Sequence, residues 1–173
     1  MSKTFIEEIE DQELKDTAQD AAIGDAHTDA ATAQGDVDAL EGVVEAQVKV
    51  AVATLAGGAA NAFAFAWQNP ESVAILIQRI FVDRTAAGGT ATAVLNIGTA
   101  ADATTHSDNL IDGLDANATG LADNITDGGT NGKSRQKLDA KDGTTDHITG
   151  QILTEAAEAL AGKVYIEYVK VRA

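Results

Sequence analysis

The pattern of apolar and polar positions changes close to residue 48. Before it, large apolar residues are few and recur at helical spacing, whereas after it they alternate with small or polar residues, the two-residue period of a β-strand. We therefore expect an N-terminal arm over residues 1–48 and a β-domain over residues 49–173. Strand-like runs within that domain occupy 48–53, 61–68, 73–83, 90–97, 146–153 and 164–171.

The clearest strand pattern is the run in which Phe63, Phe65 and Trp67 alternate with alanines. It predicts a strand with all three aromatic rings on one buried face. Residues 98–135 form a polar excursion, expected to cross one end of the domain with a helical turn at 108–114, and 154–161 are expected to be a connection. Six to eight strands separated by turn residues predict a mainly β fold, a jelly-roll-like antiparallel β-sandwich.

The arm has two parts with different patterns. Residues 18–34 are a simple mixture of Ala, Asp and Thr, with too little apolar surface to offset the ordering of the backbone, so we expect this part to order only against a partner. Val37, Leu40 and Val44 then recur at 3-then-4 spacing. This spacing fits a short coiled-coil segment at about 36–48 that joins subunits, or a single amphipathic helix packed on its own body. The arm is thus predicted to be partly helical or extended.

The charge divides at the same place as the pattern. The 173-residue chain has a formal charge of −15, of which residues 1–48 carry −11 and residues 49–173 carry −4. Nucleic-acid binding is not expected, because it depends on clustered Lys and Arg. The chain has no cysteine, no apolar run long enough for a membrane span and no N-terminal signal-peptide pattern. Abundant Asp, Ala and Thr are also compatible with a halophilic origin.

Candidate chemistry is sparse. Asp102, Asp108, Asp112 and Asp115 are weak candidates for a calcium site, since calcium accepts six to eight oxygen ligands, but their spacing matches no EF-hand loop. Acids in such loops more often cap turns. Apart from calcium, no cofactor is expected.

Three further patterns fail as catalytic or metal motifs. The Gly132-Lys133-Ser134 sequence lacks the first glycine of a phosphate loop, because that position is Asp127. The chain's three histidines are scattered, and the adjacent residues His106, Ser107 and Asp108 cannot face one another as a hydrolytic relay. The sequence therefore predicts a protein that is not an enzyme.

Several turn and strand segments of the β-domain together resemble a known family. They are Trp67-Gln-Asn-Pro-Glu71, the stretch from Asn96 to Leu114, Asp127-Gly-Gly-Thr-Asn-Gly-Lys133 and the closing strand Val164-Tyr-Ile-Glu-Tyr168. Over roughly residues 63–170 the chain resembles capsid decoration and head-fibre structural proteins of tailed viruses, either bacteriophages or archaeal viruses. The resemblance does not extend to the arm.

This resemblance implies a virion structural protein on the outer surface of the capsid. Its N-terminal arm would bind the major capsid protein and its β-sandwich would project outward, as a homotrimer. The expected subunit contacts are Val37, Leu40 and Val44 in the arm and exposed aromatic surface at Phe63, Phe65 or Tyr165. The alternative is a tail-fibre or surface adhesin module whose 98–135 loops bind a receptor or glycan. That excursion has no aromatic ring of the kind that glycan sites usually offer.

Overall fold

The computed structural model describes residues 14–32, 34 and 47–171. The chain divides into two compact units, residues 1–45 and 46–173. In the first unit, residues 14–32 form an α-helix. The second unit contains nine strands among its described residues: β1 (Lys49–Gly58), β2 (Phe63–Gln68), β3 (Ile75–Ala86), β4 (Val94–Ala100), β5 (Ile111–Asp115), β6 (Gly120–Asp123), β7 (Gln136–Leu138), β8 (His147–Leu153) and β9 (Ala157–Lys170).

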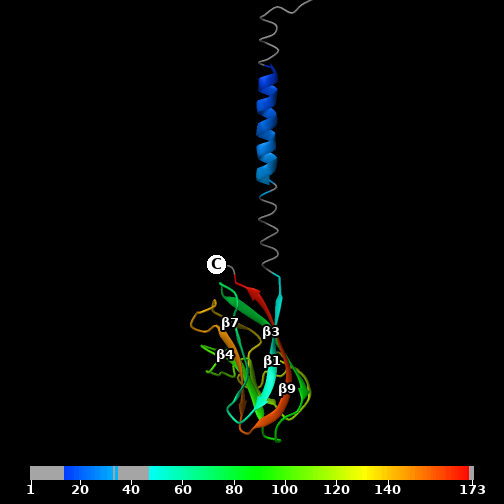
Figure 1. The fold of residues 1–173 in the computed structure, drawn as a ribbon, viewed down its shortest axis with the longest axis vertical. Coiled ribbons are helices and arrows are strands. Elements are labelled where there is room, and N and C mark those ends of the chain that lie inside the picture. The colour runs from blue at the N-terminus through cyan, green and yellow to red at the C-terminus, as the bar shows by residue number, and fades with distance from the viewer. Residues whose placement is uncertain (1–13, 33, 35–46, 172–173) are drawn as a thin grey trace, which may run out of the picture. The chain divides into compact units, whose positions relative to one another are not determined.

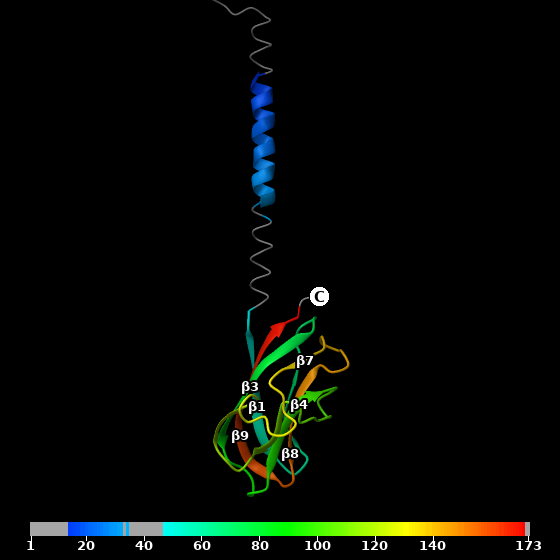
Figure 2. The ribbon, with the colours of Figure 1, turned by 180° about the vertical axis from the view of Figure 1, so that it is seen from behind.

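The nine strands form two antiparallel sheets that pack as a sandwich (Figures 1 and 2). The first sheet has the order β1-β9-β3-β6, with β7 also paired to β3, and the second has the order β2-β8-β4-β5. The pairing is symmetrical along the chain, since β4 pairs with β5, β3 with β6, β2 with β8 and β1 with β9. The chain is therefore one long hairpin folded over into two sheets, which confirms the predicted jelly-roll-like sandwich.

The core lies between the sheets and consists mainly of aliphatic side chains. On β9, Val164, Ile166 and Tyr168 point inward, while Tyr165, Glu167 and Val169 lie on the outer face. On β3, Ile75, Ile77, Ile80 and Val82 are fully buried. Inward and outward residues alternate along each strand until a register shift interrupts the alternation.

Register shifts explain where the predicted elements differ from the observed ones. The predicted helical turn at 108–114 is wrong, because Ile111 and Leu114 belong to strand β5. The β4–β5 register shifts between Leu95 and Ile97, so that residues three apart on β5 are both buried. Three-residue spacing, which indicates a helix in sequence, is here produced by a bulge.

A second difference concerns residues 154–161, predicted to be a connection. Strand β9 already begins at Ala157, where Ala157 and Leu160 are buried. The register of β9 shifts against both neighbours in this region, between Ala56 and Gly58 on β1 and between Arg84 and Ala86 on β3. The irregular pairing hides the two-residue period from the sequence.

Asn124 interrupts the edge strand beside β3. Strands β6 and β7 pair with successive parts of β3, and residues 124–135 leave the sheet between them. The Asn124 side chain takes over the pairing: its Oδ1 accepts from the Ile80 N–H at 2.8 Å, and its Nδ2 donates to the carbonyls of Lys133 and Ser134. One buried side chain thus holds both ends of the excursion against the sheet.

Candidate functional site

The helix of the arm carries acids and no packed face. Every described side chain between residues 14 and 32 is exposed, including Leu14 at 70% and Ile23 at 49%. The expectation that residues 18–34 order only against a partner stays a prediction, and residues 14–32 are helical. Alanine has the highest helix propensity, so this stretch forms a helix without a buried face. Val37, Leu40 and Val44 lie outside the described residues.

Among the described residues, no helix is both long and apolar enough to cross a membrane.

The two phenylalanines expected at a subunit contact are separated by a bulge. Phe63 pairs with Gln151 and Phe65 pairs with Gly150, so β2 has an extra residue between them. Because adjacent residues of β8 point to opposite faces, Phe63 and Phe65 also point to opposite faces. The expectation that the two rings share one face is therefore wrong.

Phe65 belongs to the core of its own domain. Its side chain is 6% exposed, and its ring lies over Gly150, where an added Cβ would come within 2.3 Å of the ring. The prediction that Phe65 contacts a partner subunit is therefore wrong, because this ring is already buried within its own chain. Phe63 is half-buried and remains on the surface.

A row of exposed valines lies on the neighbouring strand. Val48, Val50 and Val52 are 57%, 58% and 55% exposed and share the outer face of the first sheet at its β1 edge. Val50 is opposite Glu167 and Val52 is opposite Tyr165 on β9. The alternation of these residues is visible in the sequence, but their exposure is not. The signal that could have found it is the absence of charge from residue 50 to residue 70.

A cluster around Glu71 closes the end of the domain at which β1 begins and β9 ends (Figure 1). One Glu71 oxygen is 2.7 Å from the Lys49 ammonium, and the other is 3.3 Å from the Lys170 ammonium. The Tyr168 hydroxyl donates to Glu71 at 3.2 Å, and the Tyr168 ring lies 5.6 Å from that of Trp67. The cluster joins three segments distant in sequence.

The charged groups of this cluster shift one another's pKa values. The hydrogen bond from Lys49 lowers the pKa of Glu71, and the same bond raises the pKa of Lys49. Burial, followed by the nearby Glu71 carboxylate, raises the pKa of Tyr168. At neutral pH the arrangement therefore holds Glu71 ionised and Lys49 charged.

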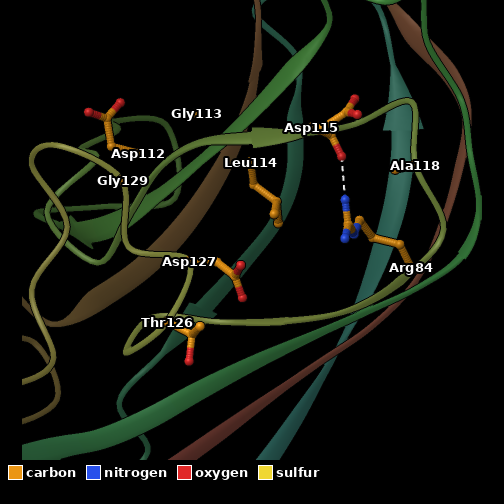
Figure 3. Close-up of a pocket in the computed structure, with 9 residues that line it drawn as sticks. All are labelled: Arg84, Asp112, Gly113, Leu114, Asp115, Ala118, Thr126, Asp127 and Gly129. Atoms are coloured by element: carbon orange, nitrogen blue, oxygen red, sulfur yellow. Dashed lines mark hydrogen bonds between the residues drawn. The ribbon is translucent and has the colours of Figure 1, made fainter.

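A hollow of about 490 Å³ lies beside β5, the edge strand of the second sheet that is farthest from β2 (Figure 3). The Arg84 guanidinium donates to the backbone carbonyls of Asp115 and Gly120. Figure 3 shows Arg84 pointing at the Asp115 backbone, with Asp112 at the far end of the hollow. The lining consists of Arg84, Asp112, Gly113, Leu114, Asp115, Ala118, Thr126, Asp127 and Gly129, which include no aromatic ring.

The carboxylates around this hollow are engaged with their own loops. Asp115 accepts from the Asn117 N–H at 2.8 Å, Asp127 accepts from the Asp123 N–H at 2.9 Å, and Asp112 accepts from the Asn131 N–H at 3.2 Å. Such bonds are typical of acids that cap turns. They give the loops their shape.

The four aspartates weighed as calcium ligands are not brought together. Asp102 accepts from the N–H and hydroxyl of Thr104, and Asp108 accepts from the Asn131 side chain at 2.9 Å. Only Asp112 and Asp115 line the hollow. Among the residues that the structure describes, no three or more His, Cys, Asp or Glu side chains are grouped to hold a metal ion.

Three solved structures of viral origin are similar to this chain. A chain of the cyanophage Pam1 capsid asymmetric unit is 23% identical with a TM-score of 0.41, covering 72% of this chain and 86% of that one. A chain of infectious bursal disease virus, Gx strain, is 11% identical (TM-score 0.36), and one of the VP2 subviral particle of the same virus is 12% identical (TM-score 0.33). They cover 72% and 73% of this chain, which spans 33% and 38% of theirs. No protein-family model matches, and no curated protein does.

Proposed function

We propose that this chain is a virion structural protein, a capsid decoration or head-fibre protein. Its arm, residues 1–48, binds the major capsid shell, and its β-sandwich, residues 49–173, projects from the outer surface as a homotrimer. The role is structural and not enzymatic. The resemblance of residues 63–170 to such proteins supports the proposal, together with the division of the chain into an acidic helical unit and a β-sandwich unit.

The observation that carries the proposal is the helix of the arm. Its two large apolar residues, Leu14 and Ile23, are exposed. Its acidic residues are exposed as well, namely Asp16, Asp20, Asp25 and Asp29. Most of the stability of protein helices comes from packing an amphipathic face, and the described residues of this helix have no packed face. Leu14 and Ile23 are nine residues apart and therefore lie on opposite sides of the helix. A basic partner that encloses the helix between apolar surfaces would contact both of them and the acids. The shell is the partner that the resemblance implies.

The test is co-sedimentation with empty shells assembled from the major capsid protein of the virus that encodes this chain. The full chain should sediment with the shells at a fixed ratio. A chain lacking residues 1–45 should stay in the supernatant, with its folding checked by circular dichroism. The proposal fails if the shortened chain decorates the shells as fully as the intact one.

A second variant tests the arm within the full chain. Replacing Leu14 and Ile23 with serine removes the exposed apolar residues of the helix without altering its charge. Binding to shells should fall at least tenfold. The matched control is Leu121→Ser, which removes a residue of the β-sandwich that is 65% exposed and should leave shell binding unchanged. A glycan array with specific hits would favour the adhesin function instead.

A further inference from the structure

One side of the sandwich has very few charged residues. The longest uncharged run of the chain covers residues 50–70, in a protein whose formal charge is −15. This run contains nearly all of β1 and all of β2, which lie against each other. Each is the edge strand of its sheet, since β1 begins the order of the first and β2 that of the second. We call the surface formed by residues 48–68 the β1/β2 side.

Burial does not explain this lack of charge. Residues 85–101 are also uncharged, but they include β4, which is flanked by β8 and β5 inside the second sheet. An edge strand presents unpaired backbone groups, and proteins usually protect such edges with charged residues, proline or a covering loop. Between Lys49 and the bulge near Gly57, β1 has neither charge nor proline.

The same side exposes its apolar row on the outer face of the sheet. Val50 and Val52 on β1 follow Val48, which directly precedes the strand, and Val52 is opposite the half-buried Tyr165 on β9. Tyr165 is in turn opposite Phe81 of β3, also half-buried. The Arg79 guanidinium lies over the Phe81 ring, 4.3 Å from its centroid, so the exposed apolar surface extends from the free edge of β1 to Tyr165 on β9. Contiguous exposed surface of this kind marks an interaction site.

We propose that the β1/β2 side is the surface through which copies of this chain pack against one another around a threefold axis. In such an assembly this side of each copy faces the threefold axis, and each pairwise contact joins two different parts of it. The inference names the contact surface of the proposed homotrimer and rests on the trimer part of the proposed function. It places the contact at the valine row and the β1 edge, in place of Phe65.

The distribution of charge indicates that the molecule bound to the β1/β2 side is a second copy of this chain. Residues 49–173 have a net charge of −4, so two copies of the sandwich repel each other through any face that carries many acids, and this repulsion is smallest at the β1/β2 side. A basic partner would instead be attracted to an acidic face. The charged neighbours of the valine row on β9 are Glu167, opposite Val50, and Lys163, opposite Thr54, which together are neutral. Interface cores are likewise depleted of charge.

The experiment compares the mass in solution of three full-length proteins by light scattering and sedimentation equilibrium. The wild type should have the mass of three 17.8 kDa chains, about 53 kDa. The double variant V50D/V52D should have the mass of one chain at the same concentration. The control L121D also places an acid at an exposed apolar position of the first sheet, on the β6 edge, and should keep the mass of the wild type.

Folding and function are separated by two further readouts. Because both valines are more than half exposed, V50D/V52D should retain the circular dichroism spectrum of the wild type. The surface is wrong if the double variant stays trimeric, or if L121D dissociates as well. A monomeric wild type overturns the trimer and this inference together. A trimer that V50D/V52D dissociates, but that does not bind shells, overturns the capsid role and leaves the surface standing.

Discussion

The two open sides of the sandwich differ in how their edge strands are protected. On the side of β5, β6 and β7, acids and lysines flank the edges, and the 124–135 excursion bonds to β5, with the Asp112 N–H donating to the Gly128 carbonyl and the Lys133 N–H to the Asn109 carbonyl. On the β1/β2 side Lys49 is the one charged residue, and there is no covering loop among the described residues. The first side is built to face water, and the second has the composition of a contact surface.

The largest effect is expected from Phe65, in the interior of the β1/β2 side. Phe65→Ala removes a buried ring and should lower the free energy of unfolding by about 3–5 kcal/mol. Phe63→Ala, on the opposite face of the same strand, should cost less than half as much. Urea denaturation of both variants at one protein concentration measures the difference. Equal losses would mean that the bulge does not separate the two rings.

The next effect is expected on the charged side. Asn124→Ala leaves the buried Ile80 N–H and the two carbonyls without their partner. It should lower the free energy of unfolding by about 2–3 kcal/mol, because an unsatisfied buried polar group costs 1–3 kcal/mol. Asn131→Ala, at an exposed position of the same excursion, should stay within about 0.5 kcal/mol of the wild type. Similar values for the two variants would show that the excursion is not held by Asn124.

A smaller effect should follow from the bulge of β5. Gly113 has a φ of +81° and no atom within 4 Å of an added Cβ. Substitution by alanine therefore causes no clash and costs only the free energy of holding a side chain in this backbone conformation. Gly113→Ala should lower the free energy of unfolding by about 1–2 kcal/mol. The expected loss corresponds to a lower melting temperature. An unchanged melting temperature would contradict the left-handed conformation at this residue.

The smallest effect is expected at Glu71 and depends on pH. Its pKa is lowered in the folded chain from its ordinary value of 4.5, so its contribution to stability is present above pH 4.5 and is lost as the pH falls through the folded pKa. Glu71→Gln should therefore cost about 1 kcal/mol or less near pH 7 and approach the wild type near pH 3. Melting temperatures across this range measure the gap. The control Glu158→Gln removes an exposed carboxylate. An equally large difference in melting temperature for this control would show that the ion pairs of Glu71 do not account for the effect.

Sequence patterns predicted the fold class because most core residues alternate along their strands, as in 73–83 and 164–171. They failed where a bulge changes the period, at Phe63 and Phe65 and again at Ile111 and Leu114. They could not identify the edge strands, because strand order depends on which segments meet after folding. The exposure of Val50 and Val52 therefore became visible only with the sheet order, although the uncharged run was present in the sequence.

The position of β1 also determines how the molecule bears mechanical load. The covalent chain enters the sandwich at the start of β1, so a pull on the arm that is carried along the chain reaches the sandwich there. Antiparallel hydrogen bonds run perpendicular to their strands, and β1 is paired with β9 at nine positions. A pull along β1 therefore loads these bonds in shear, all at once rather than one after another. The ion pairs of Glu71 with Lys49 and Lys170 link the start of β1 to the end of β9, where the force is applied.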